Sequence, residues 1–414
     1  MLLARLFDRL IKFGTLTVID ANGKSHSFGG EGGPNVTLRL HDKSLHYKMF
    51  FRPQLYAGEA YMDGTLTIEE GTLYDFLDMF LTNVQQYQPG PVGIAIGKIA
   101  WCWNWFSHLI PPPRARANVA HHYDLSGTLY DLFLDKDRQY SCAYFVRGNE
   151  TLEAAQDNKK RHIAAKLLLD RPGLKILDIG SGWGGLALYL AEVADAEVTG
   201  ITLSEEQVKV SNERARDAGL DNRVHFECQD YRDLRGQYDR IVSVGMFEHV
   251  GAPQYDEFFR QVHDLLKPDG VALLHSIGCM GEPEVTSPWL RKYIFPGGHT
   301  PALSEVQPSV EKSGLWVTDV EILRLHYAET IKHWHTRFEA HRDEIRDLYD
   351  ERFCRMWELY LLGCELAFRR QGHMVFQMQL ARDQEAVPLT RDYITAWEDA
   401  HRPDQRVRAV AKSR

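Results

Sequence analysis

The chain has 414 residues, more than one average domain needs, so we expect at least two structural units. Its hydrophobic content of 44% and charged content of 25% are ordinary for a globular protein. The formal net charge of −9 argues against general attraction to nucleic acid.

Six cysteines form no CxxC pair and no zinc-ligand spacing, which predicts reduced thiols, no metal site and a cytoplasmic protein. The N-terminus is not expected to be a signal peptide, because Arg5, Arg9 and Lys12 interrupt its apolar run. No stretch reaches the ~18 uncharged apolar residues of a membrane span.

Apolar side chains recur at helical spacing at the start of the chain, at Leu3, Leu6, Phe7, Leu10 and Ile11. The pattern predicts a short basic amphipathic helix, which either docks on its own domain or lies on a membrane surface. A strand-like alternation over residues 36–40 and a helical segment over 73–81 follow. We therefore expect residues 1–88 to form a small α+β domain.

Proline-rich segments at residues 89–91 and 111–113 predict a linker over residues 89–117. The linker contains Trp101, Trp103, Trp105 and Phe106. Such aromatic residues suit a membrane–water interface or the packing between two domains, and the sequence leaves both open. A basic tail is expected over residues 396–414.

Regular α/β alternation begins near residue 175 and predicts an α/β fold for the second domain, which is expected over residues 118–395. The expected strands cover 174–179, 197–202, 223–228, 238–244 and 271–277, and the expected helices cover 183–193, 204–218 and 254–266. Ser204 is the predicted N-cap of its helix, with Gln207 at the capping-box position. A helical stretch over 329–370 and a final edge strand over 375–380 complete a doubly wound sheet, whose ligands bind at the carboxyl ends of the strands.

The sequence Asp178-Ile179-Gly180-Ser181-Gly182-Trp183-Gly184-Gly185 lies where the first of these strands passes into a helix. It matches the dinucleotide pattern GxGxxG, which by itself is a weak signal. A dinucleotide site also needs an acidic residue near the end of the second strand to bind the ribose, and the strand here ends at Thr202 without one. An acid, Asp230, follows the third strand instead. This placement favours an S-adenosylmethionine site over a dinucleotide site or a turn without a ligand.

Several motifs together resemble the cyclopropane-fatty-acid-phospholipid synthases and the related mycolic acid cyclopropane synthases. They lie at residues 121–126, 140–145, 178–185, 202–204, 247–249, 326–330 and 363–364. The resemblance implies a seven-stranded class I methyltransferase sheet with a helical acyl-binding insertion. It implies methyl transfer from S-adenosylmethionine to a cis double bond of an acyl chain, followed by proton loss and ring closure. The N-terminal domain resembles that of the phospholipid-acting members.

The same resemblance implies a catalytic group that holds bicarbonate as the base: Glu248, His275 and Tyr327, with backbone N–H groups of Cys142 and Ile277. Cys364 matches a cysteine once proposed as a nucleophile, but a thiolate has no task in a carbocation mechanism, so we expect it to line the pocket. The implied S-adenosylmethionine contacts are Tyr123, Tyr140, Ser141, Asp178, Gly180, Gly182, Gly184, Thr202, Gln207, Asp230 and Tyr231.

The resemblance also implies peripheral contact with a phospholipid bilayer, at the inner face of the cell membrane, and suggests a homodimer. Three alternatives stay open. The same scaffold makes methyl-branched or methylene chains in some relatives. A small-molecule methyltransferase would leave the bicarbonate residues without a purpose. A non-catalytic lipid-binding protein would not need Glu248, His275 and Tyr327.

Overall fold

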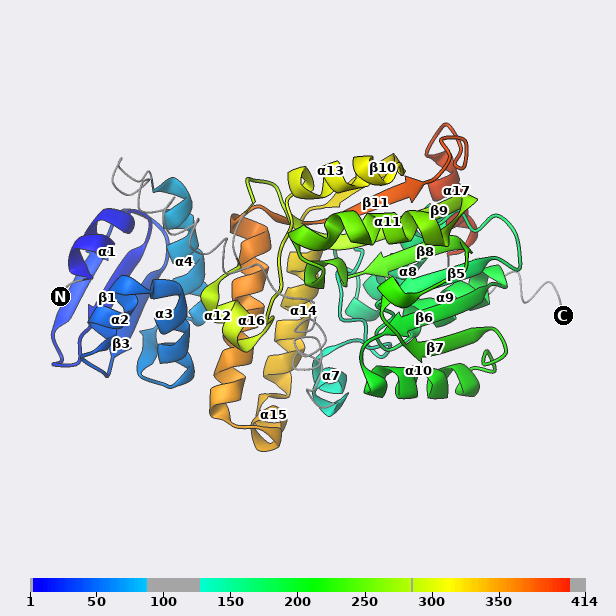
Figure 1. Ribbon diagram of the computed structural model, residues 1–414. Coiled ribbons are helices and arrows are strands. Elements are labelled where there is room, and N and C mark those ends of the chain that lie inside the picture. Colours follow the sequence, from blue (N-terminus) through cyan, green and yellow to red (C-terminus); the bar gives the residue numbers. More distant parts are fainter. Residues whose placement is uncertain (1–2, 88–126, 284–285, 403–414) are drawn as a thin grey trace.

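A computed structural model describes residues 3–87, 127–283 and 286–402. The ribbon shows a small N-terminal unit at one end, a layer of long helices beside it, and a large sheet with flanking helices at the other end (Figure 1). The predicted linker over 89–117, its tryptophans and Tyr123 lie outside the described residues, as do the last residues of the predicted basic tail.

The N-terminal unit is an α+β domain with a four-stranded sheet in the order β2-β1-β3-β4. Its strands are β1 (Thr15–Ile19), β2 (Ser25–Gly29), β3 (Asn35–Leu40) and β4 (Leu66–Glu70), and its helices are α1 (Ala4–Leu10), α2 (Leu45–Phe51), α3 (Pro53–Met62) and α4 (Leu73–Gln86). Alternate side chains of β1 and β3 are buried in a core of their own, as period-two patterns require. The α+β prediction for this region is confirmed.

Helix α1 places its apolar face in this core. Leu3, Phe7, Leu10 and Ile11 are all buried, and only Leu6 is exposed, at 37%. Because these side chains already pack against the sheet, they have little apolar surface left for a membrane. The structure therefore supports the first of the two alternatives for this helix, docking on its own domain.

The large sheet has seven strands in the order β10-β11-β9-β8-β5-β6-β7. The strands are β5 (Lys175–Ile179), β6 (Glu197–Thr202), β7 (Val224–Cys228), β8 (Tyr238–Val244), β9 (Leu266–Cys279), β10 (Trp316–Leu323) and β11 (His373–Ala381). The neighbours from β9 to β7 run parallel, and β11 runs antiparallel to both β9 and β10. Helices α8 (Leu152–Lys166), α9 (Gly185–Ala194), α10 (Glu205–Asp217) and α11 (Tyr255–Leu265) flank the sheet (Figure 1).

The prediction of residues 375–380 as an edge strand is wrong. Strand β11 lies between β10 and β9, and eight of its nine residues are buried. The edge strand on this side of the sheet is β10, which was not predicted. Polar residues such as Asp319 and Glu321 interrupt its apolar pattern, so the sequence did not indicate a strand here. An edge strand tolerates such residues because it needs little apolar surface.

The predicted helical stretch over 329–370 is divided into α14 (His326–Ala340), α15 (Arg342–Leu348) and α16 (Glu351–Arg370). Helices α14 and α16 pack side by side, with α15 at the turn between them (Figure 1). The insertion after β9 adds α12 (Pro288–Tyr293) and α13 (Leu303–Ser313), and α7 (Gly127–Phe133) packs on α14. No described helix is both long enough and apolar enough to cross a bilayer.

The last helix of the described residues, α17 (Asp392–Ala400), packs against α8, where His162 on α8 contacts Glu398 at 2.9 Å. The predicted domain boundary at residue 395 therefore passes through a helix that belongs structurally to the catalytic unit.

The N-terminal domain packs against the helical layer, with α3 in contact with α12 and α16 and α4 in contact with α16. Tyr293 on α12 donates a 2.9 Å hydrogen bond to Glu59 on α3, and Lys292 contacts the same carboxylate at 2.6 Å. Trp289 on α12 lies so close to Gly58 that a Cβ there would meet its ring at 2.4 Å. Glycine at this position lets the two units approach closely.

Substitution of Gly58 by valine should therefore separate α3 from α12. We expect a drop of several degrees in melting temperature, because overpacking typically costs about 1–3 kcal/mol. The control is Gly281→Ala, since a Cβ at Gly281 has no neighbour within 4 Å. Equal melting temperatures of the two variants would contradict the close approach.

Candidate active site

The glycine turn joins β5 to α9 and has three glycines with left-handed backbone. The φ angles are +84° at Gly180, +53° at Gly182 and +82° at Gly184. A Cβ on Gly180 would lie 2.7 Å from Met246 in the loop after β8, whereas a Cβ on Gly182 would meet nothing within 4 Å. Gly180 thus permits two loops to approach, and Gly182 leaves open space beside the turn.

A cleft opens at the carboxyl ends of the parallel strands, where the fold predicts a ligand. It is lined by the glycine turn and by the ends of β6, β7 and β8, with the segment before α8 on one side. The predicted cofactor residues that line it are Tyr140, Ser141, Asp178, Gly180, Gly182, Thr202, Gln207, Asp230 and Tyr231.

Gly184 is not among the lining residues. It is the N-cap of α9, and a Cβ there would meet Phe226 at 2.7 Å and Ser211 at 3.0 Å. We therefore assign it to packing of the helix start, while Tyr123 lies outside the described residues.

Gln207 was expected to complete a capping box, and the structure corrects this. The Ser204 side chain accepts from the Gln207 N–H at 3.3 Å, which is the N-cap interaction. The Gln207 side chain instead accepts a 2.7 Å hydrogen bond from the Thr202 hydroxyl. The hydrogen bond to Thr202, at the end of β6, holds the Gln207 side chain at the cleft.

Asp178 is buried beneath the cleft, at the end of β5. Its Oδ2 atom has no hydrogen-bond partner, and burial raises the pKa of its carboxyl to about 7. An unpartnered carboxylate oxygen in a buried position is costly unless a ligand pairs with it. The second acid, Asp230, is paired with Arg232 at 2.6 Å.

A buried lysine that was not predicted, Lys159, lies under the same cleft. Lys159 on α8 donates to the Gln139 side chain at 2.6 Å and to the Ser141 hydroxyl at 2.8 Å. Burial lowers its pKa to about 8, and its charge acts on Asp178. It holds the loop over residues 139–141 in place. No local pattern marks it, since only the fold brings α8 beneath this loop.

Other lining residues were also missed, notably Arg138, Trp183 and His249. The Arg138 guanidinium lies over the Trp183 ring, 4.9 Å from its centroid, and pairs with Asp131 at 2.6 Å. Trp183 and His249 lie within the predicted motifs 178–185 and 247–249, and Arg138 lies just before the motif 140–145, so these motifs were the available signal.

Glu248 follows β8 and reaches the end of β9. Its Oε1 accepts a 2.6 Å hydrogen bond from the Ile277 N–H, and its Oε2 is buried without a hydrogen-bond partner. Burial raises the pKa of Glu248 to about 7. The N–H of Ile277, expected to face an anion, is thus engaged by the glutamate because a buried carboxylate needs a donor.

His275 lies on β9, two residues before Ile277, so the two side chains point to the same face of the sheet. The side-chain amide of Gln377, opposite it on β11, lies 3.1 Å from its Nδ1. Burial holds the pKa of His275 well below its usual range, so the ring is neutral near pH 7. Gln377 was not predicted, because it is 102 residues away in the chain.

An apolar cluster adjoins the cleft and gathers the remaining predicted residues. Cys142 and Tyr327 belong to it, and Ile277 and Cys364 pack against it. Tyr140 connects the cluster to the cleft, since it stacks on Trp334 at 5.0 Å and its hydroxyl lies 2.7 Å from that of Tyr360. Tyr140 therefore lies at the border between the cofactor cleft and an aromatic, apolar cluster that includes side chains of α14 and α16.

Cys364 is expected to be dispensable for the chemistry. Burial raises the pKa of its thiol to about 12, so it is protonated near pH 7 and cannot act as a nucleophile. We expect Cys364→Ala to keep turnover within about three-fold of the parent, as a small loss of packing predicts. A fall of 100-fold or more with the fold intact, measured by methyl transfer to lipid, would restore the thiol to the mechanism.

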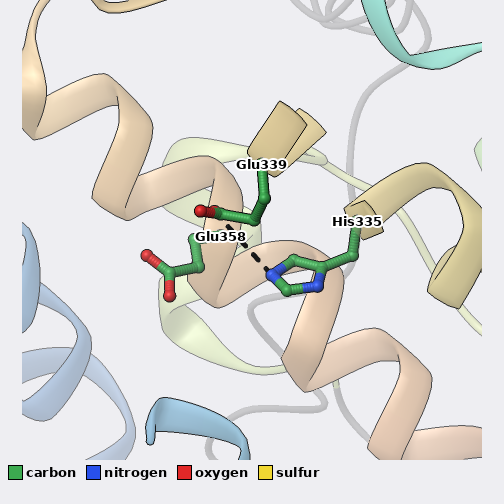
Figure 2. Close-up of side chains that lie close together, drawn as sticks. All are labelled: His335, Glu339 and Glu358. Carbon is green, nitrogen blue, oxygen red and sulfur yellow. Dashed lines mark ion pairs between the residues drawn. The ribbon is translucent and has the colours of Figure 1, made fainter. Parts of the chain in front are cut away.

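His335, Glu339 and Glu358 also gather, on α14 and α16 outside the cleft (Figure 2). The Arg342 guanidinium donates to Glu339 at 2.8 Å and to Glu358 at 2.9 Å. Tyr61 of the N-terminal domain donates to Glu358 at 2.9 Å. The group is an ion-pair network between helices, in which arginine already supplies the positive charge.

Comparison with known proteins agrees with this geometry. The sequence model named mycolic acid cyclopropane synthetase matches residues 112–378. The cyclopropane-fatty-acyl-phospholipid synthase of Escherichia coli is 38% identical over 363 residues, which cover 86% of this chain and 90% of that protein. The tuberculostearic acid methyltransferase UfaA1 of Mycobacterium tuberculosis is 35% identical over 353 residues, 79% of this chain and 78% of that one.

Among solved structures, mycolic acid cyclopropane synthase CmaA1 complexed with SAH and CTAB superposes with a TM-score of 0.61 and 35% identity, over 66% of this chain and 99% of that one. The seven-stranded sheet and the cleft at its glycine turn thus define an S-adenosylmethionine-dependent methyltransferase. Within that class, the chain belongs to the mycolic acid cyclopropane synthetase family.

Proposed function

We propose that this enzyme transfers the methyl group of S-adenosylmethionine to a cis double bond of an unsaturated phospholipid acyl chain and closes a cyclopropane ring. The observation that carries the proposal is the junction of the two compartments. Tyr140 lines the cofactor cleft and also packs against the apolar aromatic cluster. The carboxyl of Glu248 accepts from the N–H of Ile277, whose side chain packs against the same cluster. A small polar substrate would find few partners in such a compartment.

The cleft residues suit S-adenosylmethionine, which supplies an electrophilic methyl group on a sulfonium ion. The unpartnered oxygen of Asp178 suits its ammonium group, and the open space beside Gly182 suits close approach of its chain. Asp230, which follows β7, would bind the ribose or the adenine. The aromatic face of Tyr140 favours the sulfonium charge.

The apolar cluster would orient the alkene and exclude water. An alkene is a weak nucleophile, so positioning against the methyl group must supply much of the rate. Methyl addition leaves a cation on the acyl chain, which water would quench to an alcohol. Buried aromatic residues such as Tyr327, Trp334 and Tyr360 keep the compartment dry.

Bicarbonate is the base that we propose for the final proton loss. It would be held by Glu248, His275 and Tyr327. The free Oε2 of Glu248, with its pKa near 7, supports a shared proton between two groups that would otherwise repel each other. In the present structure the Ile277 N–H binds Glu248, so it would orient the glutamate; the Cys142 N–H stays a proposed anion contact.

Two observations support a phospholipid as the substrate. The chain has the N-terminal domain, which packs on α12 and α16, and 86% of this chain matches the cyclopropane-fatty-acyl-phospholipid synthase of Escherichia coli. We further propose peripheral association with the inner face of the cell membrane, and a homodimer as its assembly.

Lipid mass spectrometry of a host that expresses the protein tests the proposal. We expect unsaturated chains to gain 14 mass units. Proton NMR should then show ring methylene signals and loss of the alkene protons. An unchanged lipid profile would contradict the function. A methyl branch without a ring would instead support the second candidate, a fatty acid methyltransferase, which is favoured by the 35% identity to UfaA1.

A further inference from the structure

We propose that one corner of the N-terminal domain docks the enzyme on an anionic phospholipid bilayer. The aromatic corner consists of Tyr47, Phe50 and Phe51 on α2, with the basic residues Lys43, Lys48 and Arg52 around them. This inference rests on the proposed function, because a phospholipid substrate lies within such a bilayer.

The aromatic side chains of the corner are unusually exposed. Tyr47 is 64% exposed, Phe50 42% and Phe51 75%. The two phenylalanines touch each other edge to face, with ring centroids 5.4 Å apart. No other phenylalanine of the described residues appears among the exposed large hydrophobic side chains. Clustered exposed aromatic residues mark an interaction surface, whereas single ones are common.

These aromatic residues are not needed by the core of their own domain. The opposite side of α2 already places Leu45 and Met49 in that core. The helix is therefore anchored by one set of side chains and presents another to solvent. An amphipathic surface of this kind suits the boundary between head groups and acyl chains.

The charge around the corner fits an anionic lipid surface. Residues 41–54 contain three basic residues, Lys43, Lys48 and Arg52, and one acidic residue, Asp42. Asp42 lies 3.7 Å from Lys48. The whole chain carries a formal net charge of −9 and would be repelled by anionic head groups. A local basic corner therefore selects one orientation of the protein on the membrane.

The corner is also placed to deliver lipid to the site. Helix α3 follows α2 directly and packs against α12 and α16 (Figure 1). Leu55 and Met62 on α3 belong to the same apolar cluster as Tyr327 and Cys142. Among the described elements, α3 thus contacts both α2, which carries the proposed docking surface, and the helices α12 and α16 that contribute to the apolar cluster.

Vesicle co-sedimentation tests the proposal without any turnover. The vesicles contain diphytanoyl phosphatidylcholine and diphytanoyl phosphatidylglycerol at about 3:1, which are fluid and have no double bonds, and no cofactor is added. We expect the double variant Phe50→Ser/Phe51→Ser to lose at least about ten-fold in partitioning. Its matched control, Trp316→Ser/Leu389→Ser, removes exposed apolar side chains of the catalytic unit and should stay within about two-fold.

The charge component has its own pair of variants. Lys43→Glu/Arg52→Glu should weaken binding at least about ten-fold at low salt, whereas Lys209→Glu/Arg216→Glu on α10, with the same charge change, should do so much less. If the serine variant misfolds, hydrogen exchange on the unmodified protein decides: vesicles should protect residues 43–54 and leave α10 unchanged.

Unchanged vesicle binding of both corner variants would overturn the proposal. It would also be overturned if the serine variant only converted a dimer to a monomer in sedimentation velocity, with vesicle binding intact, because the corner would then bind a second copy of the chain. Vesicle binding by the corner without any ring product in lipid spectra would leave this inference standing and refute the proposed function.

Discussion

Replacing Glu248 with glutamine is expected to lower turnover at least 100-fold while the affinity for S-adenosylmethionine changes by less than about three-fold. Glutamine preserves the size of the side chain and its acceptor for the Ile277 N–H, so the end of β9 keeps its geometry. It cannot share a proton at Oε2 as the carboxyl does. Isothermal titration and methyl transfer to vesicles measure the two quantities.

Glu248→Ala separates the chemical role from a structural one. Alanine leaves the Ile277 N–H without its acceptor, which should cost about 1–3 kcal/mol of stability in addition to the lost turnover. If the glutamine variant retains full activity, the proposed base arrangement is wrong. If it loses cofactor affinity as strongly as turnover, Glu248 belongs to the cofactor site instead.

The second large effect is expected at Asp178. We expect Asp178→Asn to weaken cofactor binding at least ten-fold at pH 8, since the buried carboxylate would no longer pair with the ammonium group. The difference between parent and variant should shrink at pH 6. The pKa of Asp178 is raised to about 7, so most of the parent protein is protonated there and offers no negative charge.

The same substitution should stabilise the ligand-free protein. A carboxyl whose pKa rises from 3.8 to about 7 on folding contributes stability that is complete below pH 3.8 and is lost as the pH rises through 7. Asparagine does not titrate, so the melting temperature of the variant should exceed that of the parent by at least about 3 °C at pH 8 and by less at pH 5. Glu248 titrates in both proteins and cancels in the difference.

Asp221→Asn is the control for both measurements, because Asp221 is exposed and outside the cleft. It should leave affinity and melting temperature unchanged. A parent and an Asp178→Asn variant with equal affinity at pH 8 would remove Asp178 from the cofactor site.

Much of the catalytic sheet is predictable from the sequence. The strands expected over 197–202 and 238–244 match β6 and β8, and the glycine turn joins a strand to a helix as predicted. These features depend on residues close together in the chain: apolar periodicity, an N-cap and glycines with positive φ. The same local motifs carried the resemblance, and the family and the cofactor class followed from it.

The order of the strands at the sheet edge was decided only by the tertiary structure. β11 looks like any short apolar strand, and its position between β9 and β10 depends on pairing partners about 60 and 100 residues away. For the same reason the sequence did not reveal that Gln377 lies beside His275.

By itself, then, the sequence determined the class of fold, the cofactor turn and nine of the residues that line the cleft, because local motifs encode them. Only the tertiary structure placed Lys159 beneath the loop over residues 139–141 and showed that the Ile277 N–H donates to Glu248. It also decided between two uses of amphipathic helices. Helix α1 buries its apolar side chains, whereas α2 leaves Phe50 and Phe51 exposed, and no periodicity distinguishes a face that meets a core from one that meets solvent.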